Sequence, residues 1–96
     1  MSDLNRGPVL LRTFLAMTRQ PQAAAARAAN VSDVTAHHWL KGRISPTAPH
    51  RAALAEWTNG AVPAEAWDIP ALSSDVAMME AAVERARASQ PSAEAA

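Results

Sequence analysis

The sequence predicts an all-α fold of five helices in one small domain. Several stretches carry apolar residues at helical spacing, one stretch is almost entirely alanine, and Pro, Gly and Asn residues separate these stretches. The length of 96 residues and the hydrophobic content of 49% suit a single core. Because much of that content is alanine, the core is predicted to be small, and a dimer is expected to add stability. Its large members are predicted to be Leu10, Leu11, Phe14, Leu15, Trp39, Leu40, Leu54, Trp57 and Trp67.

The first helix is predicted to begin at Gly7-Pro8, because proline is favoured at the first helical position, and to run to about Met17. Its apolar stripe is expected to face the core. Residues 1–6 are expected to be loose. Arg19 follows the helix outside the stripe, and it is predicted either to contact a phosphate or to be a solvated surface side chain.

A helix-turn-helix is predicted between residues 22 and 42. The nearly all-alanine stretch from Gln22 to Ala29 has the strongest helix-forming composition in the chain, and it stops at Asn30, a residue that tolerates left-handed backbone angles. Ser32 is a good N-cap, and Asp33 in the first turn favours the positive end of a second helix. Gly42 is expected to end that helix.

The second helix of this pair, predicted over residues 33–41, has two distinct faces. Ala36, Trp39 and Leu40 fall at i, i+3 and i+4 and are expected to pack on the core. The neighbouring stripe is expected to be presented to a partner, and it consists of Asp33, Val34, His37, His38 and Lys41.

Two further elements complete the core. A basic loop over residues 41–46 is followed by Thr47, which is expected to cap a fourth helix from about Ala48 to Thr58. Leu54 and Trp57 are expected to point inward from it. Pro63 is then predicted to start a short turn of helix that carries Trp67 into the core.

Residues 71–88 are predicted to form a C-terminal helix that begins at the Ser-Ser-Asp sequence of residues 73–75. Val76, Met79, Val83 and Ala86 form a seam with 3-4-3 spacing. The seam lasts only about two heptads, so it indicates either a dimer interface, which we favour, or packing on the chain's own domain. Residues 89–96 are polar, Ala-rich and contain Pro, and they are expected to be disordered.

Several residues of the predicted helix-turn-helix match a known family in type and position: Gln22, Ala26, Asn30, Val31, Ala36 and the motif Trp39-Leu40-x-Gly42. With the downstream segment ISPTAPHRAALAEWTNGAVPAEAWDIP, they resemble the Cro and repressor-type regulators of temperate phages and bacteria. The resemblance covers residues 8–70 and implies a compact lambda-repressor-like domain that binds DNA. The family usually has Gly where this chain has Asn30. Amide side chains are common where Asp33 lies, which leaves the base preference open.

The charge distribution is consistent with a nucleic-acid partner although the formal net charge is zero. Residues 1–60 carry seven Lys or Arg and three Asp or Glu, a net charge of +4, whereas residues 61–96 carry two and six, a net charge of −4. The basic part contains the predicted helix-turn-helix. Such segregation is typical of a phosphate-binding surface with an acidic element turned away from it, although an acidic tail gives the same count.

Other classes of function have little support in the sequence. The chain has no Cys, and the adjacent residues His37 and His38 project about 100° apart on a helix, so neither disulfides nor a zinc site is expected. We found no phosphate-binding loop, nucleophile motif or paired carboxylates, so neither an enzyme nor a cofactor or small-molecule substrate is expected. No signal peptide or apolar run of membrane length is evident, which predicts a location in the bacterial cytoplasm or nucleoid.

The sequence therefore predicts a transcriptional regulator, most simply a phage or bacterial repressor that binds a palindromic operator on double-stranded DNA as a homodimer. Base contacts are predicted for Asp33, Val34, His37 and His38, and backbone contacts for Arg19, Gln22, Ser32, Thr35, Lys41 and Arg43. Thr35 has the alternative of being merely exposed, and Lys41 and Arg43 that of a solvated charge cluster. The alternative function is a protein-interaction module on the same scaffold, such as an antitoxin or anti-repressor.

Overall fold

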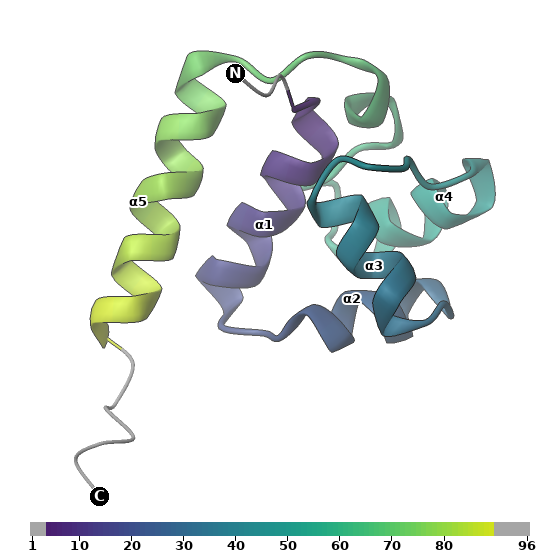
Figure 1. Ribbon diagram of the computed structural model, residues 1–96, viewed down its shortest axis with the longest axis horizontal. Coiled ribbons are helices and arrows are strands. Elements are labelled where there is room, and N and C mark those ends of the chain that lie inside the picture. Colours follow the sequence, from purple (N-terminus) through teal and green to yellow (C-terminus); the bar gives the residue numbers. More distant parts are fainter. Residues whose placement is uncertain (1–3, 90–96) are drawn as a thin grey trace, which may run out of the picture.

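The computed structural model describes residues 4–89, and these residues form five α-helices and one 3₁₀ helix without a β-strand (Figure 1). The predicted all-α fold class is therefore confirmed. None of the helices within this range is long and apolar enough to cross a membrane. The elements are α1 (Arg6–Thr18), α2 (Gln22–Ala29), α3 (Asp33–Leu40), α4 (Ala48–Trp57), η1 (Ala64–Asp68) and α5 (Ser73–Ser89). Residues 90–96, most of the predicted tail, lie outside the described range.

Helices α1 to α4 all end in the same way. In each, a residue just past the helix adopts left-handed backbone angles. The next residue's N–H then donates a hydrogen bond to the carbonyl five residues earlier, as Gln20 N–H does to Leu15 O at 2.9 Å. This closure satisfies carbonyls that the helix itself leaves open. The left-handed residues are Arg19, Asn30, Gly42 and Asn59. Asn30 and Gly42 were predicted as helix ends, whereas Arg19 in this conformation was not expected from its residue type.

The core lies between α1, the α2–α3 pair, α4 and η1. Trp39 and Trp67 are its largest fully buried members, and their ring centroids are 6.4 Å apart at an interplanar angle of 63°. Leu11, Leu15, Leu40 and Leu54 are buried as predicted, whereas Leu10, Phe14 and Trp57 are only partly buried and pack against the core from outside. Val9 and Val62 are also fully buried, although the sequence analysis did not include them.

The segment before α1 is not loose, contrary to the expectation for residues 4–6. It pairs with the chain that leads into α5: Arg6 N–H donates to Ile69 O at 2.7 Å, and Ala71 N–H donates to Leu4 O at 3.0 Å. The Asn5 side-chain amide adds a bond to Trp67 O at 2.7 Å. These bonds fix the start of α1 beside the start of α5.

Helix α5 lies along α1 and runs in the same direction, as Figure 1 shows. Its start is held by Asp75, whose carboxylate accepts from Leu72 N–H at 2.9 Å and from Arg6 Nε at 2.9 Å. The bond to Leu72 is one half of a capping box, in which an acidic residue in the third helical position reaches back to the N-cap amide. Farther along, Ala82 is the most buried apolar residue of α5.

Candidate nucleic-acid interface

Helices α2 and α3 form the predicted helix-turn-helix. Asn30 makes the turn with φ 59° and ψ 48°, and Val31 N–H returns to Ala26 O at 2.9 Å. Gln22, the first residue of α2, then joins the two helices, because its side-chain amide donates to Asp33 O at 3.1 Å. The first bond closes the turn, and the second joins the start of α2 to the start of α3.

One face of α3 packs on the core and the other is open to solvent. Ala36, Trp39 and Leu40 are buried, as the spacing predicted. At the start of the helix Asp33 is exposed, and the Val34 side chain is 64% exposed. A large apolar side chain so exposed at a helix N-terminus has no packing role in the described structure, which leaves it available for contact with a partner.

The two histidines of α3 differ in their surroundings. Both are half-buried, and their ring centroids lie 6.0 Å apart. His37 Nδ1 lies 3.4 Å from Gln22 Oε1, so this ring is oriented by α2. His38 Nδ1 is buried and has no hydrogen-bond partner among the described residues. His38 is therefore less accessible than its place on the predicted presented stripe suggested.

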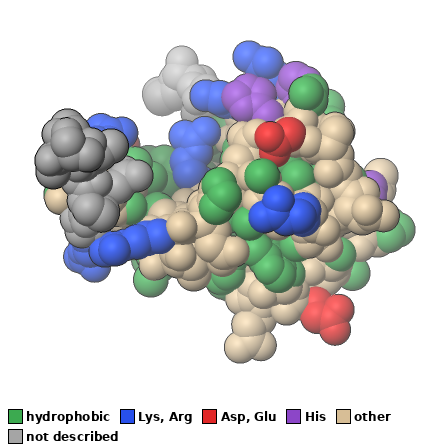
Figure 2. Space-filling model, turned by 90° about the horizontal axis from the view of Figure 1, so that it is seen from below, with side chains coloured by type: hydrophobic (Ala, Val, Ile, Leu, Met, Phe, Trp, Pro, Cys, Tyr) green, Lys and Arg blue, Asp and Glu red, His purple; other side chains and the backbone are tan. Residues whose placement is uncertain are grey.

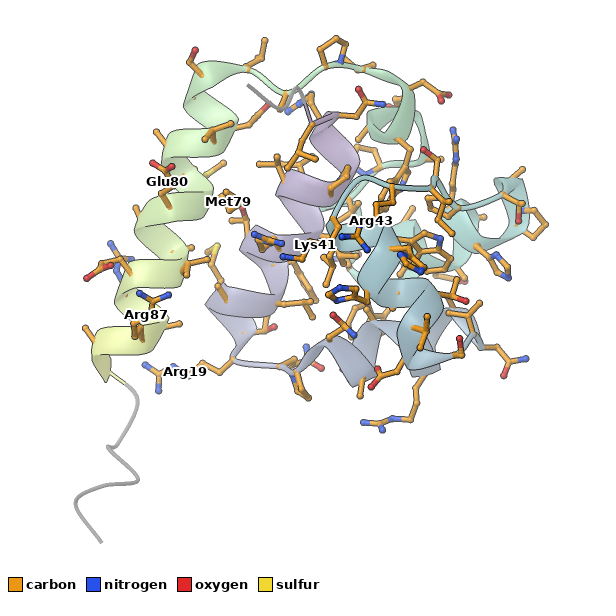
Figure 3. The ribbon with its side chains drawn as sticks, in the orientation of Figure 1. Arg19, Lys41, Arg43, Met79, Glu80 and Arg87 are labelled. Atoms are coloured by element: carbon orange, nitrogen blue, oxygen red, sulfur yellow. The ribbon has the colours of Figure 1, made fainter. Side chains whose placement is uncertain are left out.

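The residues predicted to contact a nucleic-acid backbone fall into two groups. Ser32 and Thr35 cap α3, since Thr35 N–H donates to Ser32 Oγ at 3.2 Å and their hydroxyls lie 3.0 Å apart. Gln22 bridges the two helices as described. The second group, Arg19, Lys41 and Arg43, consists of exposed cations at helix ends. Figure 3 shows Lys41 and Arg43 together beyond the end of α3, while Arg19 extends from the end of α1 toward α5.

Arg12 is a basic residue of this region that the sequence analysis did not place in the site. It lies in the middle of α1, and its Nη2 donates to Leu40 O, the last carbonyl of α3, at 3.4 Å. A cation at a helix C-terminus is favoured by the helix dipole. Arg12 thus connects α1 to the end of α3 beside Lys41, and only the fold reveals this, because the two helices are far apart in the sequence.

The predicted seam of α5 faces α1. Val76, Met79, Val83 and Ala86 are all half-buried, and they line two hollows between the two helices. In Figure 3 Met79 projects from α5 toward α1. This is the packing role that the sequence left open. A dimer contact through these four residues stays a prediction.

No group of three or more His, Asp or Glu residues suited to a metal ion occurs within residues 4–89. Comparison with known proteins adds no identification: no family model, no curated protein and no solved structure matches the chain.

Proposed function

We propose that the protein is a sequence-specific DNA-binding transcriptional regulator, and specifically a repressor that occupies a palindromic operator as a dimer. The observation that carries the proposal is the exposed first turn of α3. Asp33 and Val34 stand out from a helix whose opposite face is fixed in the core by Trp39. A short, rigidly held helix with an exposed N-terminal turn is what insertion into a major groove requires.

The chemistry of the exposed residues fits base edges. The Asp33 carboxylate accepts hydrogen bonds, as the amino group of cytosine requires, and the Val34 side chain suits the methyl group of thymine. Imidazole N–H groups of His37 and His38 donate to N7 or O6 of guanine, and for His38 only Nε2 is a candidate donor because its Nδ1 is buried. The negative charge of Asp33 disfavours phosphates, so this residue supports base reading rather than backbone attachment.

The cations around α3 bind the DNA backbone. Lys41 and Arg43 are exposed on the loop that follows the helix, and Arg12 lies beside them. Each phosphate that such a cation neutralises releases a counterion, which makes the affinity fall with salt. Ser32 and Gln22, whose side chains already order the turn, present further polar groups at the same surface.

The decisive experiment is selection of bound sequences from random duplexes, followed by affinity measurements against salt concentration. We expect an inverted repeat with half-site centres about 34 Å apart and a steep linear fall of log affinity with log salt. Lys41→Ala should weaken all duplexes equally and reduce the salt slope by about one, whereas Val34→Ala should change the preferred base at one position. Arg85→Ala on α5 removes the same charge far from α3 and serves as the control.

The histidines give a second test that is specific to α3. An imidazole N–H donates to N7 or O6 of guanine, so removal of the ring should relax the preference for guanine at the contacted position. We expect His37→Ala to change base preference at one or two adjacent positions while the circular dichroism spectrum is unchanged. Unchanged specificity in both His37→Ala and His38→Ala would remove these side chains from the reading surface.

The alternative is that the same scaffold binds protein rather than DNA, as an antitoxin or anti-repressor does. It predicts weak duplex binding without sequence preference and without effect of Val34→Ala. Selection that enriches no sequence, with a salt slope that Lys41→Ala leaves unchanged, would favour this alternative over the repressor.

A further inference from the structure

We infer that the hollow between the C-terminal halves of α1 and α5 is a docking site for an acidic, amphipathic peptide segment of another protein. This hollow, here called the α1–α5 groove, has a volume of about 510 Å³. Its base is apolar and is formed by Leu15 and Ala16 of α1 with Val83 and Ala86 of α5, and Arg12 and Arg19 line it as well. The apolar base of the groove is separate from the exposed first turn of α3, although Arg12 is shared by the two surfaces, since it also donates to Leu40 O at the end of α3. The inference does not rest on the proposed DNA binding.

The groove exists because small residues meet where the two helices touch. Ala82 is buried at 9% exposure, and a small hollow on the other side of this contact is lined by Ala16 and Ala82. Alanine side chains do not reach far enough to fill the space on either side, so Val83 and Ala86 stay half-buried. In Figure 2 hydrophobic side chains are visible at the base of a hollow beside the main body, with Lys or Arg side chains at its edge.

Charge complementarity identifies the occupant. Arg12 and Arg19 line the groove, Arg85 lines the adjoining small hollow, and none of the described residues lining either is acidic. In the view of Figure 3, Arg19 and Arg87 project from the C-terminal ends of α1 and α5. An apolar base with arginines at its edge matches a peptide that carries both apolar and carboxylate side chains.

The two ends of the α1–α5 boundary differ, which sets the direction of the peptide. Toward the start of α5 a second hollow of about 760 Å³ is lined by Val9, Val76 and Met79 together with Glu80. A carboxylate of the ligand is repelled there and attracted at Arg12 and Arg19. The acidic groups of the peptide therefore gather at the end near Arg19, and its apolar side chains lie on the base of the α1–α5 groove.

A nucleic-acid backbone is a poorer match for the same groove. Phosphates would satisfy Arg12 and Arg19, but they offer nothing to the apolar surface of Leu15, Val83 and Ala86. A sugar-phosphate chain would leave that surface uncovered, whereas burial of apolar side chains contributes about 25 cal/mol per Å². The observations thus favour a peptide.

The test is titration of the ¹⁵N-labelled full chain with synthetic peptides of about 14 residues, which span about 20 Å as a helix. The parent peptide carries Leu at helical spacing and Glu clustered toward one end. One variant peptide has Lys in place of every Glu, and another has Ser in place of every Leu. We expect the parent alone to bind and to shift the amide signals of Leu15, Val83 and Ala86.

A matched pair of variants locates the contact on α5. Ala86→Glu adds a negative charge to the apolar base of the groove and should weaken binding of the parent peptide about tenfold, equivalent to about 1.4 kcal/mol. Ala88→Glu makes the same change in the same helical turn at an exposed residue outside the groove, and it should have no effect. Arg12→Ala should weaken binding about three- to fivefold, the range for a partly exposed ion pair, and Arg27→Ala on α2 should not.

Several results would overturn the inference. The first is absence of binding by the parent peptide. The second is a variant peptide that binds with the same affinity as the parent, and the third is an equal effect of Ala86→Glu and Ala88→Glu on that affinity. Shifts of Leu15 and Val83 on addition of duplex DNA would assign the groove to nucleic acid. Concentration-dependent shifts of the same signals in the protein alone would assign it to a second copy of the chain. Each of these outcomes leaves the proposed role of α3 untouched.

Discussion

Replacing Asp75 by Ala should destabilise the protein by about 2 kcal/mol. The carboxylate caps α5 through Leu72 N–H, and loss of a cap typically costs about 1 kcal/mol. It also binds Arg6 through Nε at 2.9 Å and Nη2 at 3.4 Å. The Arg6 side chain is 33% exposed, so water replaces part of this ion pair and its loss adds only about 0.5–1 kcal/mol. For a domain of this size the melting temperature should fall by roughly 8–16 °C.

The same residue should give the protein a defined acid sensitivity. The Leu72 amide and, after it, the Arg6 guanidinium lower the pKa of Asp75, while burial acts in the opposite direction. A lowered pKa means that the stabilisation is present above the ordinary value of about 3.9 and is lost as the pH falls through the folded-state value. The parent should therefore lose more stability between about pH 5 and pH 2 than Asp75→Ala does. Part of the response should remain, because Arg51 likewise lowers the pKa of Asp68.

Thermal unfolding followed by circular dichroism at neutral and acid pH measures both effects. Asp75→Asn keeps an acceptor for Leu72 N–H but loses the charge, so its melting temperature should lie between those of the parent and Asp75→Ala. Glu84→Ala, at an exposed position of the same helix, is the control. A melting temperature of Asp75→Ala that matches that of Glu84→Ala at neutral pH would refute the assigned cap and ion pair.

Three further substitutions test the packing. Trp39→Ala should cost about 3–5 kcal/mol, because the side chain is 1% exposed in the core, and a folded variant with full stability in urea would contradict the assigned faces of α3. Gly7→Ala should cost about 1–3 kcal/mol or more, since its methyl group would overlap the Trp67 ring; thermal unfolding measures this, and an unchanged melting temperature would argue against that contact. Ala82→Leu should force α5 away from α1 and lower the free energy of unfolding by about 1–3 kcal/mol. Ala81→Leu, at an exposed position, should change the free energy of unfolding by no more than about 0.5 kcal/mol. Equal unfolding midpoints of the two variants would show that α5 does not dock as described.

The sequence predicted the helices well because their ends depend on local chemistry. Asn30 and Gly42 adopt the left-handed angles that their residue types favour, and Ser32 caps α3 through its side chain. The prediction for Thr47 was only partly right. Thr47 occupies the N-cap position of α4, but its side chain forms no cap bond, and its hydroxyl lies 3.2 Å from His50 Nδ1 instead.

Long-range packing was much less predictable. Periodicity identified the face of α5 that carries Val76, Met79, Val83 and Ala86, but periodicity is the same whether that face meets a second chain or α1. Val9 is buried and lines the same hollow as Val76 and Met79 of α5, more than 60 residues later, so its neighbours could not be inferred from its own helix. Arg12 joined the candidate interface for the same reason, through its bond to Leu40 O. The buried face of α3, which is formed by Ala36, Trp39 and Leu40, was predicted because its spacing depends on one helix alone, whereas the burial of His38 Nδ1 was not.

The pairing of Leu4 and Arg6 with the segment before α5 has a consequence for the order of folding. The Arg6–Asp75 bond spans 69 residues, whereas Gln22 and Asp33 within the helix-turn-helix are 11 apart. Closing the larger loop costs roughly 1.6 kcal/mol more chain entropy than closing the smaller one. Contacts of such high sequence separation are made after local ones. We therefore expect the α2–α3 unit to form early, and α5 to dock last and to be released first when the molecule opens locally.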